Sequence, residues 1–207
     1  MKRIFLLSYL FALSLSVVAQ NTALLPPDST FMSYVLNNGH KVEACYVVRW
    51  EDGEAMLGSN TYNRPAIDTT LVGRIEIPDH VTAPDGRNLL VTGVSRQSFA
   101  NCTKLTEVVM PELTGDIGDQ SFMNCRSLTR IVLPPTVKNV WPFAFRGCSR
   151  LNTVVVKALT PPDVYNDAFD LQAYEYVTLV VPASSEAAYK RSFVWNMFCY
   201  CFANIDE

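Results

Sequence analysis

Three stretches of this sequence are near-copies of one another: Ser98–Pro111, Ser121–Pro134 and Ala144–Lys157. Equivalent places in the copies hold a phenylalanine, a cysteine and a leucine at intervals of 23 residues: Phe99, Phe122 and Phe145; Cys102, Cys125 and Cys148; Leu105, Leu128 and Leu151. Because three different residue types recur at the same interval, the sequence contains a true internal repeat. Such a chain folds as a row of stacked units, because one unit alone cannot bury its apolar face.

The spacing within each copy predicts the structure of one unit. In the middle copy, Leu128, Ile131 and Leu133 fit the pattern L-x-x-L-x-L, which at this period is typical of leucine-rich repeats. We expect these side chains to point inward from a strand, with Phe122 and Cys125 packed behind them. Small residues before each phenylalanine should allow the tight return of the chain. The predicted fold class is a leucine-rich-repeat solenoid, rich in β-strands with short helical turns, whose coils stack at about 4.8 Å.

Weaker copies extend the repeat in both directions. Residues 74–78 end like a repeat, and residues 177–182 close another. The sequence therefore predicts about five coils of ~23 residues, which form a solenoid over residues 70–182. Because the ends of a stack must be covered, residues 20–69 are predicted to be a hairpin-like lead-in cap, and residues 183–207 a helical C-terminal cap.

The first residues of the chain have the three parts of a secretory signal. Lys2 and Arg3 precede an apolar run that ends in small residues at Ala19, so residues 1–19 are predicted to be a signal peptide. An uncleaved membrane anchor is the alternative. No second long apolar segment follows, so we expect no membrane span in the mature chain. The predicted location is secreted or on the cell surface, with the periplasm as the other compartment that fits.

The repeat resembles the BspA-like class of bacterial leucine-rich repeats, whose units read roughly I-G-x-x-A-F-x-x-C-x-x-L-x-x-I-x-I-P. The matching residues in the middle copy are Ile117, Gly118, Phe122, Cys125, Leu128, Ile131 and Pro134. The third copy departs from the pattern, with Val140 and Trp141 in the Ile-Gly places and Lys157 in place of the proline. The resemblance implies an exported or surface-attached protein of host-associated bacteria, a family in which some members are adhesins.

The alternation of side chains along a strand predicts a candidate binding surface. If Leu128, Ile131 and Leu133 face the core, then Arg130 and Val132 face solvent, as do their counterparts in other repeats. This predicted strand face has two columns: Arg74, Glu107, Arg130, Thr153 and Thr178 beside Glu76, Val109, Val132, Val155 and Val180. Stacked exposed valines beside mixed charges are typical of a contact surface. Alternatively, β-branched residues simply suit exposed strands, or a terminal segment covers them.

These features favour a non-catalytic, adhesin-like protein that binds a protein or glycan ligand through the strand face. Host extracellular matrix is one candidate partner. The alternative is an envelope or secreted structural scaffold that self-associates. A formal net charge of −3 without a basic tract makes nucleic acid an unsuitable partner.

Neither a cofactor nor a metal ion is expected. The chain has no nucleophile elbow, zinc-protease motif or phosphate-binding glycine loop. His40 and His80 lack the paired spacing of metal ligands, and Cys199 and Cys201 have no companions. The repeat cysteines are interpreted as small core residues with free thiols, while bridging between stacked neighbours remains an open alternative.

Overall fold

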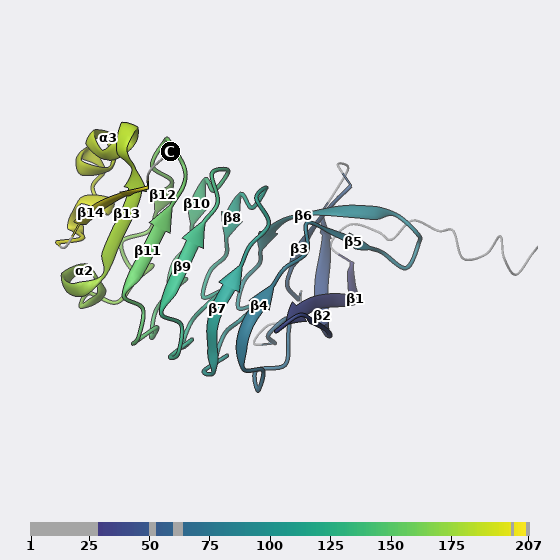
Figure 1. Cartoon of the computed structure of the whole chain (residues 1–207). Coiled ribbons are helices and arrows are strands. Elements are labelled where there is room, and N and C mark those ends of the chain that lie inside the picture. Colours follow the sequence, from purple (N-terminus) through teal and green to yellow (C-terminus); the bar gives the residue numbers. More distant parts are fainter. Residues whose placement is uncertain (1–28, 50–52, 60–63, 200, 206–207) are drawn as a thin grey trace, which may run out of the picture.

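The computed structural model describes residues 29–49, 53–59, 64–199 and 201–205, and the predicted signal peptide at residues 1–19 lies outside them. The strands are β1 (Thr30–Asn37), β2 (His40–Arg49), β3 (Glu54–Leu57), β4 (Gly73–Glu76), β5 (His80–Thr82), β6 (Asn88–Val94), β7 (Leu105–Val109), β8 (Asp116–Ile117), β9 (Arg130–Leu133), β10 (Asn139–Val140), β11 (Thr153–Val156), β12 (Asp163–Val164), β13 (Thr178–Pro182) and β14 (Cys201–Ile205). The helical elements are α2 (Ala173–Tyr176), α3 (Glu186–Arg191) and the 3₁₀ turns η1 (Ala183–Ser185) and η2 (Trp195–Met197). The chain is therefore rich in strands with few helices, as predicted (Figure 1).

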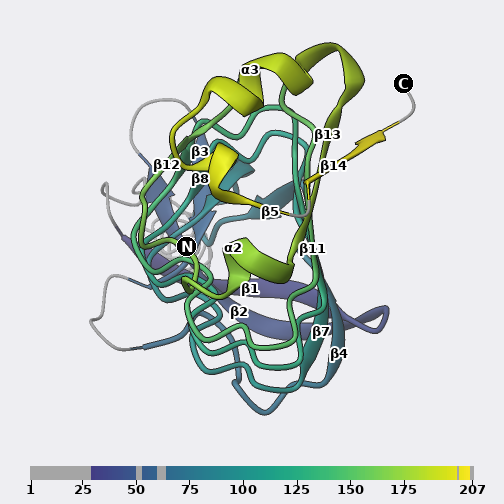
Figure 2. The same cartoon turned by 90° about the vertical axis from the view of Figure 1, so that its left-hand side faces the viewer.

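Successive repeats place their strands in two sets of parallel strands. One set runs β3–β6–β8–β10–β12, and the register through its centre aligns Asp116, Asn139 and Asp163. The other set contains β4 and β7, and then β9, β11, β13 and β14. The two sets lie on opposite sides of the stack when it is viewed along its length (Figure 2). Equivalent strands point the same way because every repeat turns in the same direction, and each repeat adds one strand spacing.

A hairpin occupies the N-terminal end of the stack. Strands β1 and β2 are antiparallel, and their turn has positive φ at Asn38 (48°) and Gly39 (85°), as a tight two-residue hairpin turn requires. Strand β1 also pairs with β4, and β2 pairs with β3. The hairpin therefore joins both sets of parallel strands.

The core consists of residues that repeat from one unit to the next. The rings of Phe99, Phe122, Phe145 and Phe169 form a column with centroid distances of 4.9, 5.3 and 5.0 Å. Each stacked pair of rings contributes about 0.5–1.5 kcal/mol beyond the burial of area. Leu128, Ile131 and Leu133 are at most 1% exposed, which confirms their predicted inward orientation.

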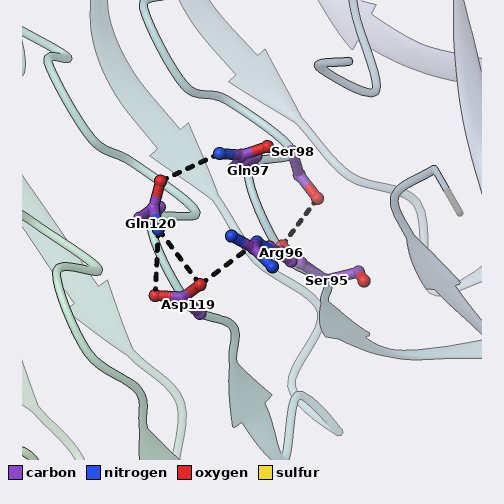
Figure 3. Close-up of polar contacts among 6 residues, drawn as sticks. All are labelled: Ser95, Arg96, Gln97, Ser98, Asp119 and Gln120. Carbon is purple, nitrogen blue, oxygen red and sulfur yellow. Dashed lines mark hydrogen bonds and ion pairs between the residues drawn. The ribbon is translucent and has the colours of Figure 1, made fainter. Parts of the chain in front are cut away.

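Small buried residues, Ser98, Ser121 and Ala144, stand directly before the phenylalanines, and the residue before each of them adopts the left-handed conformation. The residues in the left-handed region are Gln97 (φ 56°), Gln120 (φ 55°) and Phe143 (φ 56°). This conformation is uncommon for residues other than glycine and persists where the surroundings hold it. Here the side-chain amide of Gln97 donates a hydrogen bond to the side-chain oxygen Oε1 of Gln120 over 2.8 Å, which links the equivalent turns of two repeats (Figure 3).

Aromatic side chains cover the C-terminal end of the phenylalanine column. Trp195 is fully buried, meets Phe169 edge to face at 6.4 Å, and its indole N–H donates to the carbonyl oxygen of Pro162 over 2.8 Å. Tyr189 is buried beside it, whereas Phe193 is 81% exposed and takes no part in this cover. Strand β14, which the repeat pattern does not predict, pairs in parallel with β13 and extends the sheet at this end (Figure 2).

Candidate ligand-binding groove

The ten residues of the predicted strand face lie on β4, β7, β9, β11 and β13. Strand pairing aligns them in register: Arg74 with Glu107, Glu76 with Val109, Arg130 with Thr153 and Thr178, and Val132 with Val155 and Val180. Two adjacent columns therefore exist on one side of the stack. The role of these residues in ligand binding stays a prediction.

The strand face is interrupted between β7 and β9. These neighbouring strands belong to different sheets, and within the part of the chain that the structure describes no strand pairing joins them. A groove with a volume of about 850 Å³ crosses this seam and extends to Val155 on β11 and Val180 on β13. Six of the ten predicted residues line the groove: Glu107, Val109, Arg130, Val132, Val155 and Val180. The other four, Arg74, Glu76, Thr153 and Thr178, do not line it.

The valine column forms the apolar part of the groove, but it is less exposed than predicted. Val109, Val132 and Val180 are half-buried, and Val155 is only 4% exposed. The prediction of an exposed side chain is therefore wrong for Val155. Val132 and Val180 flank it one strand spacing away on either side, and their branched side chains shield it from solvent.

Charged residues at the groove include an ion pair outside the predicted strand face. Lys157 and Glu112 form an ion pair of 3.0 Å, with side chains that are 43% and 65% exposed. An exposed pair of this kind contributes about 0–1 kcal/mol to stability. The sequence does mark Lys157 as unusual, because it stands where proline ends the two preceding copies of the repeat. Glu107 and Arg130, both exposed, place opposite charges on β7 and β9.

The repeat cysteines are poorly suited to nucleophilic chemistry. Burial, with a smaller effect from the charge of Asp68, raises the pKa of Cys102 to about 12. The neighbouring Cys148 side chain, together with burial, raises the pKa of Cys125 well above its usual range. Both side chains therefore remain thiols near neutral pH, while the thiolate is the reactive form.

Two further properties bear on the kind of site this molecule can hold. Among the described residues, no group of three or more His, Cys, Asp and Glu side chains is placed to bind a metal ion. Over the same residues, no helix has the length and apolar character needed to cross a membrane. Cys199 is exposed, and the side chain of Cys201 lies outside the described part.

The chain is similar to two solved structures of bacterial repeat proteins. A leucine-rich cell surface protein from Faecalibacterium prausnitzii A2-165 is 21% identical with a TM-score of 0.47, and the match covers 78% of this chain and 41% of that protein. The chain thus spans less than half the length of that protein. A leucine-rich repeat protein from Bacteroides capillosus ATCC 29799 is 25% identical with a TM-score of 0.39, over 55% of this chain and 93% of that one.

No curated protein matches the chain. The family described as BspA type leucine-rich repeat region matches residues 74–203 in six copies. That match covers well over half of the sequence and includes every strand of the groove. The chain therefore belongs to the BspA-type leucine-rich repeat family.

Proposed function

We propose that this protein is an exported, surface-associated adhesin that binds a protein ligand in the groove between β7 and β9. The proposal treats residues 1–19 as a signal peptide and residues 70–182 as a solenoid of about five coils, capped by residues 20–69 and 183–207. The observation that carries it is the groove itself, where the strand pairing stops and an apolar surface becomes accessible between charged residues.

The groove combines the two components of a specific contact surface. Its valines supply apolar area in a concave place, where desolvated contacts contribute most to affinity. Glu107 on β7 and Arg130 on β9 supply opposite charges, which orient a ligand and set its register. At about 850 Å³ the groove accommodates a few side chains, so an extended segment or loop of the partner is the expected ligand.

Binding of the full chain to a panel of immobilised extracellular matrix proteins and glycans tests the proposal. We expect saturable binding to a matrix protein that Arg130→Glu weakens about tenfold or more, since this change removes a charge complementary to the partner and adds a repulsive one. Arg126→Glu is the matched control, because Arg126 is exposed on the same repeat but does not line the groove. Equal loss in both variants, or loss in neither, would place the ligand outside the groove.

Self-association is the second candidate function, and it has its own structural support. Leu171, just before α2, and Phe193, between α3 and η2, are large apolar side chains that are 76% and 81% exposed and available for contact. A scaffold protein would form larger species with rising concentration in light scattering, and Phe193→Asp would reduce them. A monomer at all concentrations would remove this candidate.

A further inference from the structure

A second recess, of about 310 Å³, lies on the opposite set of strands. The recess lies beside a column of equivalent residues, each of which directly follows a strand of this set. These residues are Ser95 after β6, Gly118 after β8, Trp141 after β10 and Tyr165 after β12. Backbone hydrogen bonds keep this column in register: the amide of Gly118 donates to Val94, that of Trp141 to Ile117, and that of Tyr165 to Val140. The column therefore changes from small to large side chains between Gly118 and Trp141.

This change in side-chain size places the Trp141 ring beside a shallow surface formed by Gly118 and Ser95, which is called the floor of the recess. Trp141 stacks on Tyr165, with ring centroids 5.5 Å apart and an interplanar angle of 20°, and it remains 39% exposed. On its other side lies Gly118, which has no side chain, followed by Ser95, and all three residues line the recess. A Cβ atom at Gly118 would lie 2.6 Å from the carbonyl carbon of Ser95, so the packing of the repeats requires glycine here. The floor is therefore a fixed feature of the stack.

Two carboxylates stand beside this floor, and each is held by basic and amide groups. Asp116 lies 3.5 Å from the Arg49 guanidinium and accepts a hydrogen bond of 2.7 Å from the side chain of Asn139. The Asp116 side chain is 26% exposed.

Asp119 has an equivalent environment. It is paired with Arg96 over 3.1 Å and accepts a hydrogen bond of 3.2 Å from the side-chain amide of Gln120 (Figure 3). The Asp119 side chain is 28% exposed. A carboxylate has about four lone-pair sites, so Asp116 and Asp119 are both oriented and still able to accept further hydrogen bonds.

We propose that this recess binds a neutral hexopyranose unit of a glycan. The apolar C–H face of the sugar ring stacks on Trp141, as large aromatic rings pack well against apolar surface. Asp116 and Asp119 accept hydrogen bonds from sugar hydroxyl groups, and the arginines keep these carboxylates in position. Two carboxylates and two guanidinium groups cancel in charge, which favours a neutral sugar over a sialylated or sulfated one.

The surroundings of the recess argue against a peptide bound by strand addition. Strand β8 is paired on both sides, with β6 and with β10, so it has no free edge to extend. The site lies on the other side of the stack from the groove between β7 and β9, and its ligand class is different. An experiment can therefore disprove the saccharide site without disproving the proposed protein-binding groove, and the reverse also holds.

A printed array of neutral, sialylated and sulfated oligosaccharides, probed with the full chain, tests the proposal. The strongest neutral oligosaccharide is then titrated by isothermal calorimetry. We expect Trp141→Ala and Asp119→Asn each to weaken its binding about tenfold or more. Trp141→Tyr, which keeps a stacking ring, should retain most of the affinity and shows that the position itself tolerates substitution. Tyr176→Ala is the matched control, because it removes an exposed aromatic ring outside the recess.

Three results would overturn the saccharide site. The first is the absence of binding to any neutral oligosaccharide at millimolar concentration, and the second is binding confined to anionic glycans. The third is unchanged saccharide affinity in Trp141→Ala. Loss of a protein ligand in Trp141→Ala, without any saccharide binding, would identify the recess as a protein contact. Arg130→Glu should leave saccharide binding unchanged, which separates this site from the groove.

Discussion

The thiol of Cys125 donates a hydrogen bond to the main-chain carbonyl oxygen of Phe99, 3.1 Å away in the preceding repeat. Cys148 makes the same contact with Phe122, also at 3.1 Å. The carbonyl of Phe99 already accepts the amide N–H of Cys102, so the thiol supplies a second donor to a buried oxygen. This contact explains why the repeat position holds cysteine and not merely any small apolar residue.

Replacing this thiol should destabilise the fold modestly. Cys125→Ala removes the sulfur donor and leaves a small void, so we expect the free energy of unfolding to fall by about 1–2 kcal/mol. Urea unfolding under reducing conditions measures the change. Cys199→Ala is the control, since Cys199 is exposed and should alter stability by less than about 0.5 kcal/mol. Equal stability of the two variants would show that the contact contributes nothing.

The inward leucine of a repeat should matter more than the thiol. Leu128 is fully buried, and Leu128→Ala should cost about 2–5 kcal/mol because the surrounding repeats relax only partly into the cavity. Leu159 is 65% exposed, and Leu159→Ala should be nearly neutral. Thermal and urea unfolding of both variants check the difference. Normal stability of Leu128→Ala would contradict the assignment of this side chain to the core.

Alkaline pH should destabilise the protein through its buried acids. Burial raises the pKa of Cys102 from 9.0 to about 12, so the folded state holds its proton where the unfolded chain loses it. The stabilising contribution is therefore complete below pH 9 and is lost as pH rises from about 9 to about 12, at up to about 1.4 kcal/mol per pH unit.

Urea unfolding with a reductant, at several pH values between about 8 and 11, measures this dependence. Cys102→Ala should flatten the decline in the free energy of unfolding, whereas Cys199→Ala should leave it unchanged. A Cys102→Ala variant with the full wild-type slope would show that other groups cause the alkaline loss. Tyr174, whose pKa burial raises to about 12, is the next group to replace.

The cover of the C-terminal end depends on a buried hydroxyl group. Tyr189 donates a hydrogen bond of 2.7 Å to the main-chain carbonyl of Ala158. Tyr189→Phe keeps the ring but leaves that oxygen without this donor, which should lower the free energy of unfolding by about 1–2 kcal/mol. Tyr176→Phe, at a position that is 46% exposed, should have no measurable effect. Thermal unfolding distinguishes the two variants, and identical curves would contradict the role assigned to this bond.

The sequence pattern was sufficient to predict which side chains of a repeat face the core. The orientation of Ile131 and Leu133 follows from alternation along a strand and recurs at a fixed period, so three copies reinforce one interpretation. The left-handed turns at Gln97 and Gln120 were not predictable in this way, because glutamine is not a residue that prefers positive φ. Contacts between neighbouring repeats stabilise these turns, and such contacts require the fold to be known.

The two proposed binding surfaces were also only partly predictable from the sequence. Pairing in register placed Val132 and Val155 in one column as expected, but the seam between β7 and β9 has no counterpart in the motif, which is the same in both repeats. The saccharide recess did have a signal in the sequence. Gly118 in one repeat is replaced by Trp141 at the equivalent position of the next repeat. Because the repeats stack, the tryptophan ring lies next to a position that has no side chain.

Amide hydrogen exchange of the full chain, with and without a bound matrix ligand, tests the central claim of a ligand-binding groove most directly. Because residues of both β7 and β9 line the groove, a ligand bound there covers these strands and slows the opening of their amides. We expect slower exchange on ligand binding in Thr106–Met110 and Thr129–Leu133, with little change in the hairpin of β1 and β2. Protection confined to the hairpin or to the C-terminal elements, with β7 and β9 unchanged, would contradict the claim.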